Sequence, residues 1–381
     1  MSQISTKSPI GINGAGRIGK LLLWSLSKKK MQDEITISTG REVGRSLDDF
    51  FDYITHDSTY GSYERMMFGI QNEPRAKISG DSIYLNGMKV NWLNKPEYRT
   101  PGNIDWSDHG VEVVFDTTGK MRDPTVFEPN SLRGHLESAK KVILSAPFKV
   151  GAKGTAIPED AVTVVGGVNF DKYDPDVHRV ISNASCTTNC CAPPIKALVD
   201  HFYDKFLSYS ITTVHAATNS QTTLDLVPRA GDSNTRIRRS IINNIIPSTT
   251  GAAKAVFDVI PEIRDIGIGS QASAIRVPTT TGSIVIMDIS LDGEYDNDYM
   301  HNIFREYSSK NPEIMKFSDK QLVSADIVGS TYSTVYDSPF THHRTSKRGD
   351  ELHTMVDLNF WYDNEFGYVS SMMRLLDLVY Q

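Results

Sequence analysis

Residues 10–20 read IGINGAGRIGK, and the expected fold of the first half of the chain follows from them. It spaces glycines at Gly14, Gly16 and Gly19, after a short apolar run and before a segment with helical periodicity. Glycines at this spacing permit a tight turn, a close approach of the backbone to a pyrophosphate and close packing of the helix on the strand. The N–H groups and the dipole at the start of the helix attract phosphate. The stretch therefore predicts a dinucleotide-binding turn, with a purely structural turn as the alternative.

Short β-rich runs alternate with amphipathic segments across the first half of the chain. This alternation is typical of a parallel sheet that is covered by helices. The expected strands span residues 9–13, 35–38, 111–115, 142–145, 162–165 and 180–181, and the expected helices include residues 18–29 and 125–140.

The second half of the chain has longer β-rich stretches with fewer helices between them, which indicates an antiparallel sheet backed by helices. The expected strands lie in residues 207–216, 272–291, 333–336 and 355–362, and the expected helices span residues 187–202, 252–259, 298–308 and 367–380. Residues 193 and 194 are prolines, so the first of these helices requires them to lie early in it or to kink it. We predict an α/β fold with two domains. A Rossmann dinucleotide-binding domain spans residues 1–185 together with the C-terminal helix 365–381, and an α+β catalytic domain with a mostly antiparallel sheet spans residues 186–364.

The bulk composition excludes several classes of protein. Hydrophobic residues make up 39% and charged residues 23% of the 381 residues, which is ordinary for a soluble globular protein. The formal net charge of -6 argues against a nucleic-acid-binding surface. No run approaches the about 20 apolar residues that a membrane span needs, and residues 1–14 lack the apolar stretch of a secretory signal. We expect a cytoplasmic protein without nucleic-acid or membrane partners.

The chain contains 3 cysteines, and they are clustered. Cys186, Cys190 and Cys191 have neither the distant partners of a disulfide framework nor the paired spacing of a zinc site, so no metal is predicted. Cys186 follows a strand-like run and precedes a helical segment, where the helix dipole would lower the pKa of its thiol. His215, which ends another β-rich run, is the candidate base. The alternative for each cysteine is a small buried apolar side chain.

The end of the second expected strand bears on the choice of cofactor. It runs into Thr39-Gly40-Arg41-Glu42. Glu42 can accept hydrogen bonds from both hydroxyls of an adenosine ribose, which favours NAD, whereas Arg41 can pair with a 2′-phosphate, which favours NADP. We expect NAD, with NADP left open.

Two stretches are specific enough to identify a family: ISNASCTTNC, at residues 181–190, and WYDNEFGY, at residues 361–368. Together with the glycine turn they show that the chain resembles the phosphorylating glyceraldehyde-3-phosphate dehydrogenases over nearly its whole length. Further matching segments are HDSTYG at 56–61, TTG at 117–119, SAP at 145–147, TVHAAT at 213–218, STTGAAKA at 248–255 and RVPT at 276–279.

This resemblance implies a reaction. Cys186 would attack the aldehyde carbon of D-glyceraldehyde 3-phosphate, and His215 would take the hydroxyl proton as hydride leaves for the nicotinamide. Inorganic phosphate would then cleave the thioester to 1,3-bisphosphoglycerate, a reversible step of glycolysis and gluconeogenesis. The family also implies a homotetramer.

The resemblance assigns binding roles as well. The residues implied for the cofactor are Gly14, Gly16, Arg17, Ile18, Glu42, Arg99, Thr118, Ser145 and Asn364. Those implied for the substrate and the attacking phosphate are Ser185, Thr187, Thr218, Arg239, Thr250 and Gly251. Hydroxyls and free N–H groups before the expected helix 252–259 agree with a phosphate site there.

The chain departs from the family pattern at several places. Ala15 stands where Phe is usual, Arg41-Glu42 replaces the usual Asn-Asp, and the loop 221–237 is longer and lacks a common Gln-Lys pair. Residues 149–160 and 338–350 are expected to be surface loops. Two alternatives remain: an erythrose-4-phosphate dehydrogenase, which shares SNASCTTNC but usually departs from the phosphate-site sequence kept here at residues 250–254, and a catalytically silent NAD-binding relative.

Overall fold

The computed structural model of the chain describes residues 4, 8–70, 73–151, 154–232 and 234–381. The sequence-based expectations for residues 1–3 and 5–7, and for Ala152, Lys153 and Ser233 in two loops, lie outside the described residues. The chain divides into two compact units. Unit 1 comprises Met1–Val164, Asn169–Ser185 and Met372–Gln381, and unit 2 comprises Val165–Val168 and Cys186–Ser371. The separate functions expected for the two domains stay predictions.

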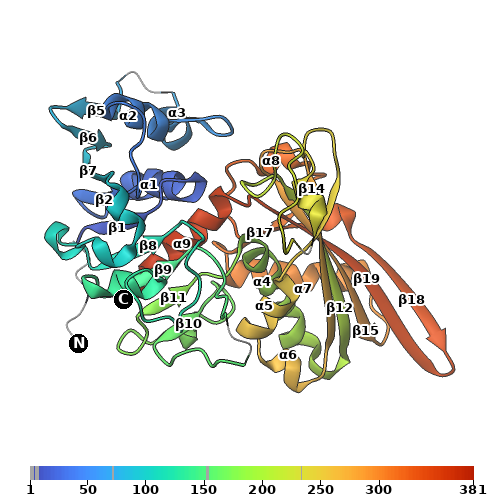
Figure 1. Ribbon diagram of the computed structural model, residues 1–381. Helices are drawn as coiled ribbons and strands as arrows, with labels where there is room; N and C mark the ends of the chain where they lie inside the picture. The colour runs from blue at the N-terminus through green and yellow to red at the C-terminus, as the bar shows by residue number, and fades with distance from the viewer. Residues whose placement is uncertain (1–3, 5–7, 71–72, 152–153, 233) are drawn as a thin grey trace. The chain divides into compact units, whose positions relative to one another are not determined.

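Unit 1 is built on a mostly parallel sheet (Figure 1). Its strands are β1 (Ile10–Asn13), β2 (Glu34–Ser38), β5 (Ala76–Ser79), β6 (Ser82–Leu85), β7 (Met88–Leu93), β8 (Val113–Asp116), β9 (Lys141–Leu144), β10 (Ala161–Thr163) and β11 (Val180–Ser182). They lie in the order β10-β11-β9-β8-β1-β2-β7-β6-β5, and only the β7-β6-β5 end pairs in the antiparallel sense. β1 is buried along its whole length and pairs with β2 and β8, which explains its continuous apolar run. The predicted Rossmann-type fold is confirmed.

The glycine turn joins β1 to helix α1 (Arg17–Lys29). Gly14 has a φ of 106°, which side chains other than glycine rarely adopt, and its N–H donates to the carbonyl oxygen of Ser38 at 2.8 Å. A Cβ on Gly19 would lie 1.9 Å from the carbonyl oxygen of Gly14. A side chain at Gly19 would therefore push the helix off the turn.

The predicted helix over residues 125–140 is wrong. This segment forms irregular loop and the 3₁₀ turn η4 (Leu132–Glu137). Pro129 removes one helical N–H donor, and the hydroxyl of Ser131 bonds the carbonyl oxygens of Val126 and Glu128. Gly134 packs so closely that a Cβ there would lie 2.1 Å from the carbonyl oxygen of Pro129. Local side-chain bonding thus replaces the helical ladder.

Both units contain further short elements. Those of unit 1 are the helices α2 (Leu47–Thr55) and α3 (Tyr63–Phe68), the strands β3 (His56–Asp57) and β4 (Gly61–Ser62), and the 3₁₀ turns η1 (Pro96–Arg99), η2 (Pro101–Asn103), η3 (Ser107–His109) and η5 (Phe170–Lys172). Unit 2 contains η6 (Tyr203–Lys205), η7 (Thr235–Arg238) and η8 (Ser338–Phe340).

Unit 2 has a mostly antiparallel sheet, as predicted. Its strands are β12 (Phe206–Ala216), β13 (Ile246–Thr249), β14 (Gly269–Val277), β15 (Ser283–Asp292), β16 (Met315–Ser318), β17 (Thr334–Asp337), β18 (His342–Arg348) and β19 (Glu351–Tyr362). The order is β13-β14-β12-β15-β19-β17-β16, with β18 added to β19. The pairs β12–β14 and β16–β17 are parallel and the other neighbours are antiparallel. β12 alternates between buried and partly exposed residues, as a strand with one covered face should.

The helices of unit 2 are α4 (Cys186–Phe202), α5 (Ala252–Val259), α6 (Glu262–Asp265), α7 (Asn297–Lys310), α8 (Ser324–Ile327) and the first part of α9 (Phe366–Val379). Of these, α4, α5, α7 and α8 contact strands of the sheet. α4 contacts β12, β15, β17 and β19 as well as α5 and α7, so it is the central helix of the unit. It is assigned as one unbroken helix, although Pro193 and Pro194 lie in its interior. Because α4 is buried along most of its length, packing fixes the position of Cys186 at its start.

The expectation of a surface loop over residues 338–350 is wrong. Residues 342–348 form β18, which pairs with β19 in a hairpin that extends beyond the ends of β12 and β15 (Figure 1). β18 is exposed along almost its whole length, so no apolar alternation marks it as a strand. Gly349 and Asp350 form the turn at its tip.

Candidate active site

The structure brings Cys186 and His215 together in unit 2. Cys186 is the first residue of α4, and His215 lies near the carboxyl end of β12. The Sγ of Cys186 lies 3.5 Å from the Nε2 of His215. Cys186 is partly exposed, whereas Cys190 and Cys191 are fully buried one turn further along the helix. Of the three thiols, Cys186 is therefore the one that is both partly exposed and next to an imidazole.

A strained turn precedes the cysteine. Ala184 has a φ of 52°, in the left-handed region that residues with a Cβ disfavour. The hydroxyl of Ser182 holds this turn, since it accepts a hydrogen bond from the N–H of Ala184 at 3.1 Å and donates to the carbonyl oxygen of Ala146 at 2.8 Å. Backbone strain of this kind is retained where the surrounding structure fixes it, often at functional sites.

Tyr362 supports the pair from β19. Its hydroxyl lies 3.0 Å from the Oγ1 of Thr187 and 2.9 Å from the Oγ1 of Thr213, and all three groups are buried. The edge of its ring meets the ring of His215, with centroids 5.9 Å apart at 79°. Tyr362 thus orients both the imidazole and a hydroxyl that follows the nucleophile. Sequence reasoning gave it no role, although it lies in the WYDNEFGY segment.

Arg276 is a second residue that sequence reasoning missed. Pairing of β12 with β14 places His215 opposite Arg276. The Nη1 of Arg276 lies 2.6 Å from the Nδ1 of His215 and donates to the carbonyl oxygen of Ala216 at 3.2 Å. In the sequence, Arg276 is recognisable only as a cation inside a β-rich run, at the start of the RVPT segment. The strand register is what shows that Arg276 contacts His215.

The electrostatics of the pair differ from the expectation. Burial, followed by the charge of Arg276, lowers the pKa of His215 to about 3, and the carbonyl of Ala216 offsets this only in part. Burial raises the pKa of the Cys186 thiol, although Arg276 and the hydroxyl of Thr187 oppose the rise. The prediction of a lowered thiol pKa is therefore wrong. Both shifts favour the uncharged forms of the thiol and the imidazole.

Of the residues expected to hold phosphate, Ser185 and Thr187 flank Cys186 in the sequence, whereas Thr218 and Arg239 bond to residues near them. The hydroxyl of Thr218 lies 2.9 Å from the hydroxyl of Ser220 and donates to the Oε1 of Gln221 at 3.0 Å. Arg239 pairs with the carboxylate of Asp225 at 2.9 Å, and both side chains are exposed. Ser185 directly precedes Cys186. The hydrogen bonds of the described residues do not link Thr218 or Arg239 to the Cys186–His215 pair.

Thr250 and Gly251 lie at the start of α5. Gly251 is the N-cap residue, and no side chain caps the helix there. The hydroxyl of Thr250 accepts a hydrogen bond from the N–H of Ala252 at 3.2 Å. A helix start without a side-chain cap, next to hydroxyl groups, has the chemistry of an anion site.

Three of the residues expected to bind the cofactor meet at one edge of the sheet in unit 1. Gly14, Thr118 and Ser145 follow β1, β8 and β9, which are neighbouring parallel strands. The buried carboxylate of Asp116 accepts hydrogen bonds from the N–H and the hydroxyl of Thr118 at 2.9 and 2.7 Å. The N–H of Ser145 donates to the backbone carbonyl of Asp116 at 2.9 Å. The carboxyl edge of parallel strands is where such folds bind nucleotides.

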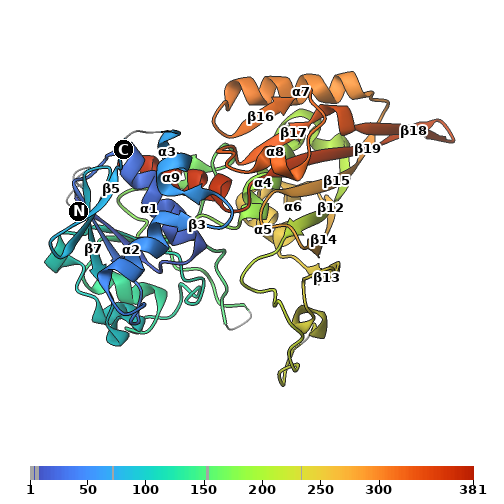
Figure 2. The same cartoon turned by 90° about the horizontal axis from the view of Figure 1, so that it is seen from above.

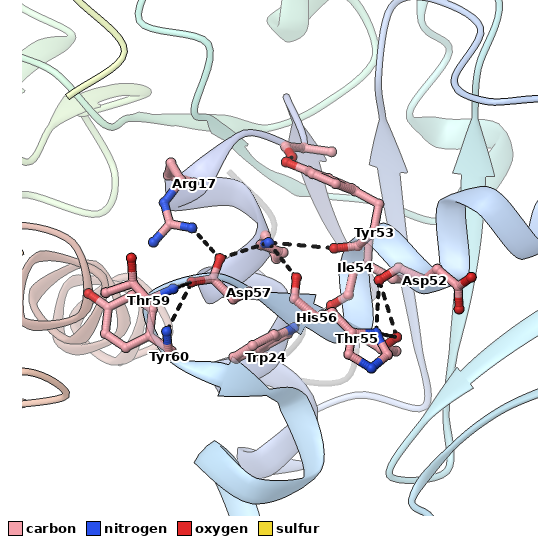
Figure 3. A network of polar contacts seen from close by, with 12 residues as sticks. Arg17, Trp24, Asp52, Tyr53, Ile54, Thr55, His56, Asp57, Thr59 and Tyr60 are labelled. Carbon is pink, nitrogen blue, oxygen red and sulfur yellow. Dashed lines mark hydrogen bonds and ion pairs between the residues drawn. The ribbon is translucent and has the colours of Figure 1, made fainter. Parts of the chain in front are cut away.

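A polar network centred on Asp57 fixes the start of α1 (Figure 3). Arg17 and Lys20, both in the first turns of the helix, form ion pairs with the Asp57 carboxylate, at 2.8 Å for Lys20. The N–H groups of Thr59 and Tyr60 donate to the same carboxylate at 2.9 and 3.1 Å. Burial alone would raise the pKa of Asp57, but these donors outweigh it and lower the pKa. The HDSTYG segment thus positions Arg17 beside the glycine turn.

The other expected cofactor residues have these surroundings. Glu42 is exposed after β2, and the Nε of Arg99 donates to the carbonyl oxygen of Gly40 in the same turn at 3.1 Å. In unit 2, the Oδ1 of Asn364 accepts hydrogen bonds from the hydroxyls of Ser283 and Thr281 at 2.9 and 3.3 Å. Arg99 therefore supports the turn that carries Glu42, and the amide of Asn364 is held in one orientation.

The residues present fit a dinucleotide. Gly16 is the N-cap of α1, no side chain caps that helix, and a Cβ built on Gly16 would meet nothing within 4 Å. Space and N–H donors therefore remain where a pyrophosphate would lie. Across the described ranges no group of His, Cys, Asp and Glu side chains could hold a metal ion, and no helix is long and apolar enough to cross a membrane.

Comparison with known proteins gives matches over both units. Residues 8–124 match a family model described as the NAD binding domain of glyceraldehyde 3-phosphate dehydrogenase, and residues 185–364 match the model of its C-terminal domain. Among the similar proteins is a glyceraldehyde-3-phosphate dehydrogenase of Streptomyces coelicolor, 34% identical over 97% of this chain and 96% of that protein. Glyceraldehyde-3-phosphate dehydrogenase 1 of Drosophila melanogaster is 36% identical over 98% of both chains. A glyceraldehyde-3-phosphate dehydrogenase of Geobacillus stearothermophilus is 34% identical over 97% of this chain and 96% of its own length.

Proposed function

Because the chain belongs to the glyceraldehyde-3-phosphate dehydrogenase family as a divergent member, we propose that it converts D-glyceraldehyde 3-phosphate and inorganic phosphate to 1,3-bisphosphoglycerate with NAD. The observation that carries the proposal is the 3.5 Å distance between the Sγ of Cys186 and the Nε2 of His215. A thiol beside an imidazole is the pairing that thioester chemistry requires. The glycine turn of unit 1 supports the part of the proposal that names a dinucleotide cofactor.

The first half of the reaction oxidises the aldehyde. The Sγ of Cys186 bonds to the aldehyde carbon while the thiol proton passes to the carbonyl oxygen, which gives a hemithioacetal. His215 then takes the hydroxyl proton at Nε2 while the hydrogen on the same carbon leaves with its electron pair. NAD, when bound, supplies the acceptor for this hydride. The product is a thioester on Cys186, and the N–H of Cys186 is our candidate donor to the oxyanion.

The second half transfers the acyl group to phosphate. A phosphate oxygen bonds to the thioester carbon, and the Sγ of Cys186 leaves as a thiolate. The residues that we assign to the attacking phosphate are Thr250, Gly251, Ser185 and Thr187. Thr218 is assigned to the phosphate of the substrate. Arg239 is assigned to the space between the two anions, and this role requires its ion pair with Asp225 to open.

Phosphate dependence is the decisive test of this function. We expect NADH formation from D-glyceraldehyde 3-phosphate to require inorganic phosphate or arsenate, because water cleaves the thioester far more slowly at a site built for an anion. Initial rates should be measured with NAD and with NADP, each with and without phosphate. Equal rates without phosphate would instead favour the erythrose-4-phosphate dehydrogenase reaction. Tight binding of NAD without turnover of any aldehyde would favour a silent NAD-binding relative.

The same rates decide between the two cofactors. We propose NAD, because Glu42 can accept hydrogen bonds from the ribose hydroxyls. Arg41 and Glu42 are both exposed after β2, and the hydroxyl of Thr39 donates to the carbonyl oxygen of Arg41 at 2.7 Å. The guanidinium of Arg41 is the group in this turn that favours a 2′-phosphate.

We also propose a homotetramer. The segment between β12 and β13 extends away from the sheet of unit 2 (Figure 2) and exposes Leu224, Val227 and Ile245 to 74%, 88% and 71%. A segment that exposes several large apolar side chains is a candidate for contact with another protein. Sedimentation equilibrium should give a mass four times the 42.4 kDa of the chain. The double substitution Leu224→Lys and Val227→Lys should lower that mass, and a wild-type monomer at micromolar concentration would contradict the assembly.

A further inference from the structure

Two loops of unit 1, the one that follows β8 and the one that follows β9, border a cavity that the proposed reaction does not use. Its volume is about 360 Å³, within the range of about 300–1,000 Å³ that is typical of small-molecule sites. Lys120, Arg122 and Lys149 line it, and none of the residues assigned to the cofactor, the substrate or the attacking phosphate does. We call this space the loop cavity.

Backbone and side-chain hydrogen bonds hold the two loops together. The N–H of Lys149 donates to the carbonyl oxygen of Arg122 at 2.9 Å. The carboxylate of Asp123, which also lines the loop cavity, accepts hydrogen bonds from the N–H of Gly151 at 2.7 Å and from the N–H and hydroxyl of Thr125 at 2.9 and 2.6 Å. This carboxylate is therefore already occupied by uncharged donors, and the loops are joined without the charge of any of the three cations.

The three cations have no counter-ion in the part of the chain that the structure describes. There, the side chains of Lys120, Arg122 and Lys149 form neither an ion pair nor a hydrogen bond. Arg122 is partly buried, and the two lysines are exposed. Like charges around one cavity repel each other, and partial burial of an unpaired guanidinium is unfavourable. A bound anion would reduce both costs.

We propose that the loop cavity binds a small organic phosphate. A phosphate monoester carries a charge of about −1.5 to −2 at neutral pH, so it can interact with several cations at once. A guanidinium binds phosphate through two parallel N–H bonds, and a lysine binds it as a point charge. Met121, Val126 and Leu132 also line the loop cavity, so they offer apolar surface to the carbon part of the molecule. The proposal does not depend on the thioester chemistry, because Cys186 and His215 take no part in it.

The methyl group of Met121 reports directly on the loop cavity. In protein labelled with ¹³C at its methionine methyl groups, the NMR signal of Met121 is identified by its loss in Met121→Leu. The probes are phenyl phosphate and benzoate, which share a ring but differ in charge, and each is added with and without saturating NAD. We expect phenyl phosphate to shift the Met121 signal in a saturable way under both conditions. Benzoate should bind at least about 10-fold more weakly, because its single charge engages fewer cations.

Charge removal tests the role of the cations. The double substitution Lys120→Met and Lys149→Met changes two exposed side chains, and it should weaken the binding of phenyl phosphate about 10-fold, as expected for the loss of two charged contacts. The matched control is Lys77→Met with Lys205→Met, which makes the same change of net charge at two exposed lysines that do not line the loop cavity. This control should bind phenyl phosphate as the wild type does.

Three results would overturn the proposal: a Met121 signal that phenyl phosphate does not shift or shifts only without NAD, equal binding of benzoate, and an unchanged affinity in the Lys120 and Lys149 variant. Binding should be the same in Cys186→Ser as in the wild type. A protein that binds phenyl phosphate in the loop cavity but never oxidises the aldehyde would therefore retain this site and refute only the proposed function.

Discussion

Replacing Cys186 by serine is expected to reduce NADH formation from D-glyceraldehyde 3-phosphate on the order of 10⁴-fold or more, as loss of a nucleophile does in other enzymes of this kind. A serine hydroxyl ionises far less readily than a thiol, and an ester transfers its acyl group to phosphate less readily than a thioester does. Stopped-flow absorbance at the nicotinamide band measures the change, and mass spectrometry of the wild-type protein during turnover should find the acyl group on this residue.

Cys190→Ser is the matched control for this substitution. It makes the same atomic change one helical turn further along α4, where the Sγ is fully buried and lies 3.6 Å from the hydroxyl of Thr334 and 3.7 Å from the carbonyl oxygen of Phe360. A serine hydroxyl can use the same partners, so this variant should keep its activity. Full activity in Cys186→Ser, or acylation of another residue during turnover, would remove Cys186 from the mechanism.

Replacing His215 by asparagine is expected to lower the rate by about 10²–10⁴-fold while the affinity for NAD stays unchanged. Asparagine fills much of the same space beside Tyr362, but its amide does not accept a proton at neutral pH. The hydroxyl proton of the hemithioacetal would then have to leave for water. Single-turnover kinetics measures the rate, and fluorescence titration measures the binding of NAD.

His201→Asn controls for the general effect of losing a histidine. His201 is exposed near the end of α4, and its Nε2 lies 2.8 Å from the hydroxyl of Tyr299. Its replacement should leave both rate and affinity close to those of the wild type. If His215→Asn keeps the full rate, the base is another group.

The parts of the fold that could be predicted are those whose pattern is set by burial. The buried strand β1 and the glycine turn are examples, and so are β12, found at Phe206–Ala216 where residues 207–216 were expected, and α5, found at Ala252–Val259 as expected. The parts that could not be predicted depend on interactions other than burial. Residues 125–140 take their conformation from local side-chain hydrogen bonds. β18 has no apolar face and forms a strand because it pairs with β19.

The candidate site shows a similar division. The sequence predicted that Cys186 and His215 would act together, and the structure brings them within 3.5 Å. It did not predict Arg276, because the contact depends on the register between β12 and β14, which joins residues far apart in the chain. The predicted fall in the thiol pKa left out the burial of the thiol. Burial of the thiol acts in the opposite direction and prevails.

The outer strand of the long hairpin has a consequence for the behaviour of the protein at high concentration. Among the described residues β18 pairs with β19 alone, so one row of its backbone N–H and C=O groups has no neighbouring strand there. Such a row invites another molecule to extend the sheet into a fibre. The sequence of this strand is HHRTSKR, so any second strand that docked in the same way would bring cations against cations. The charged side chains that leave β18 without an apolar pattern therefore also oppose aggregation through this strand. This protection should weaken as salt screens the charges.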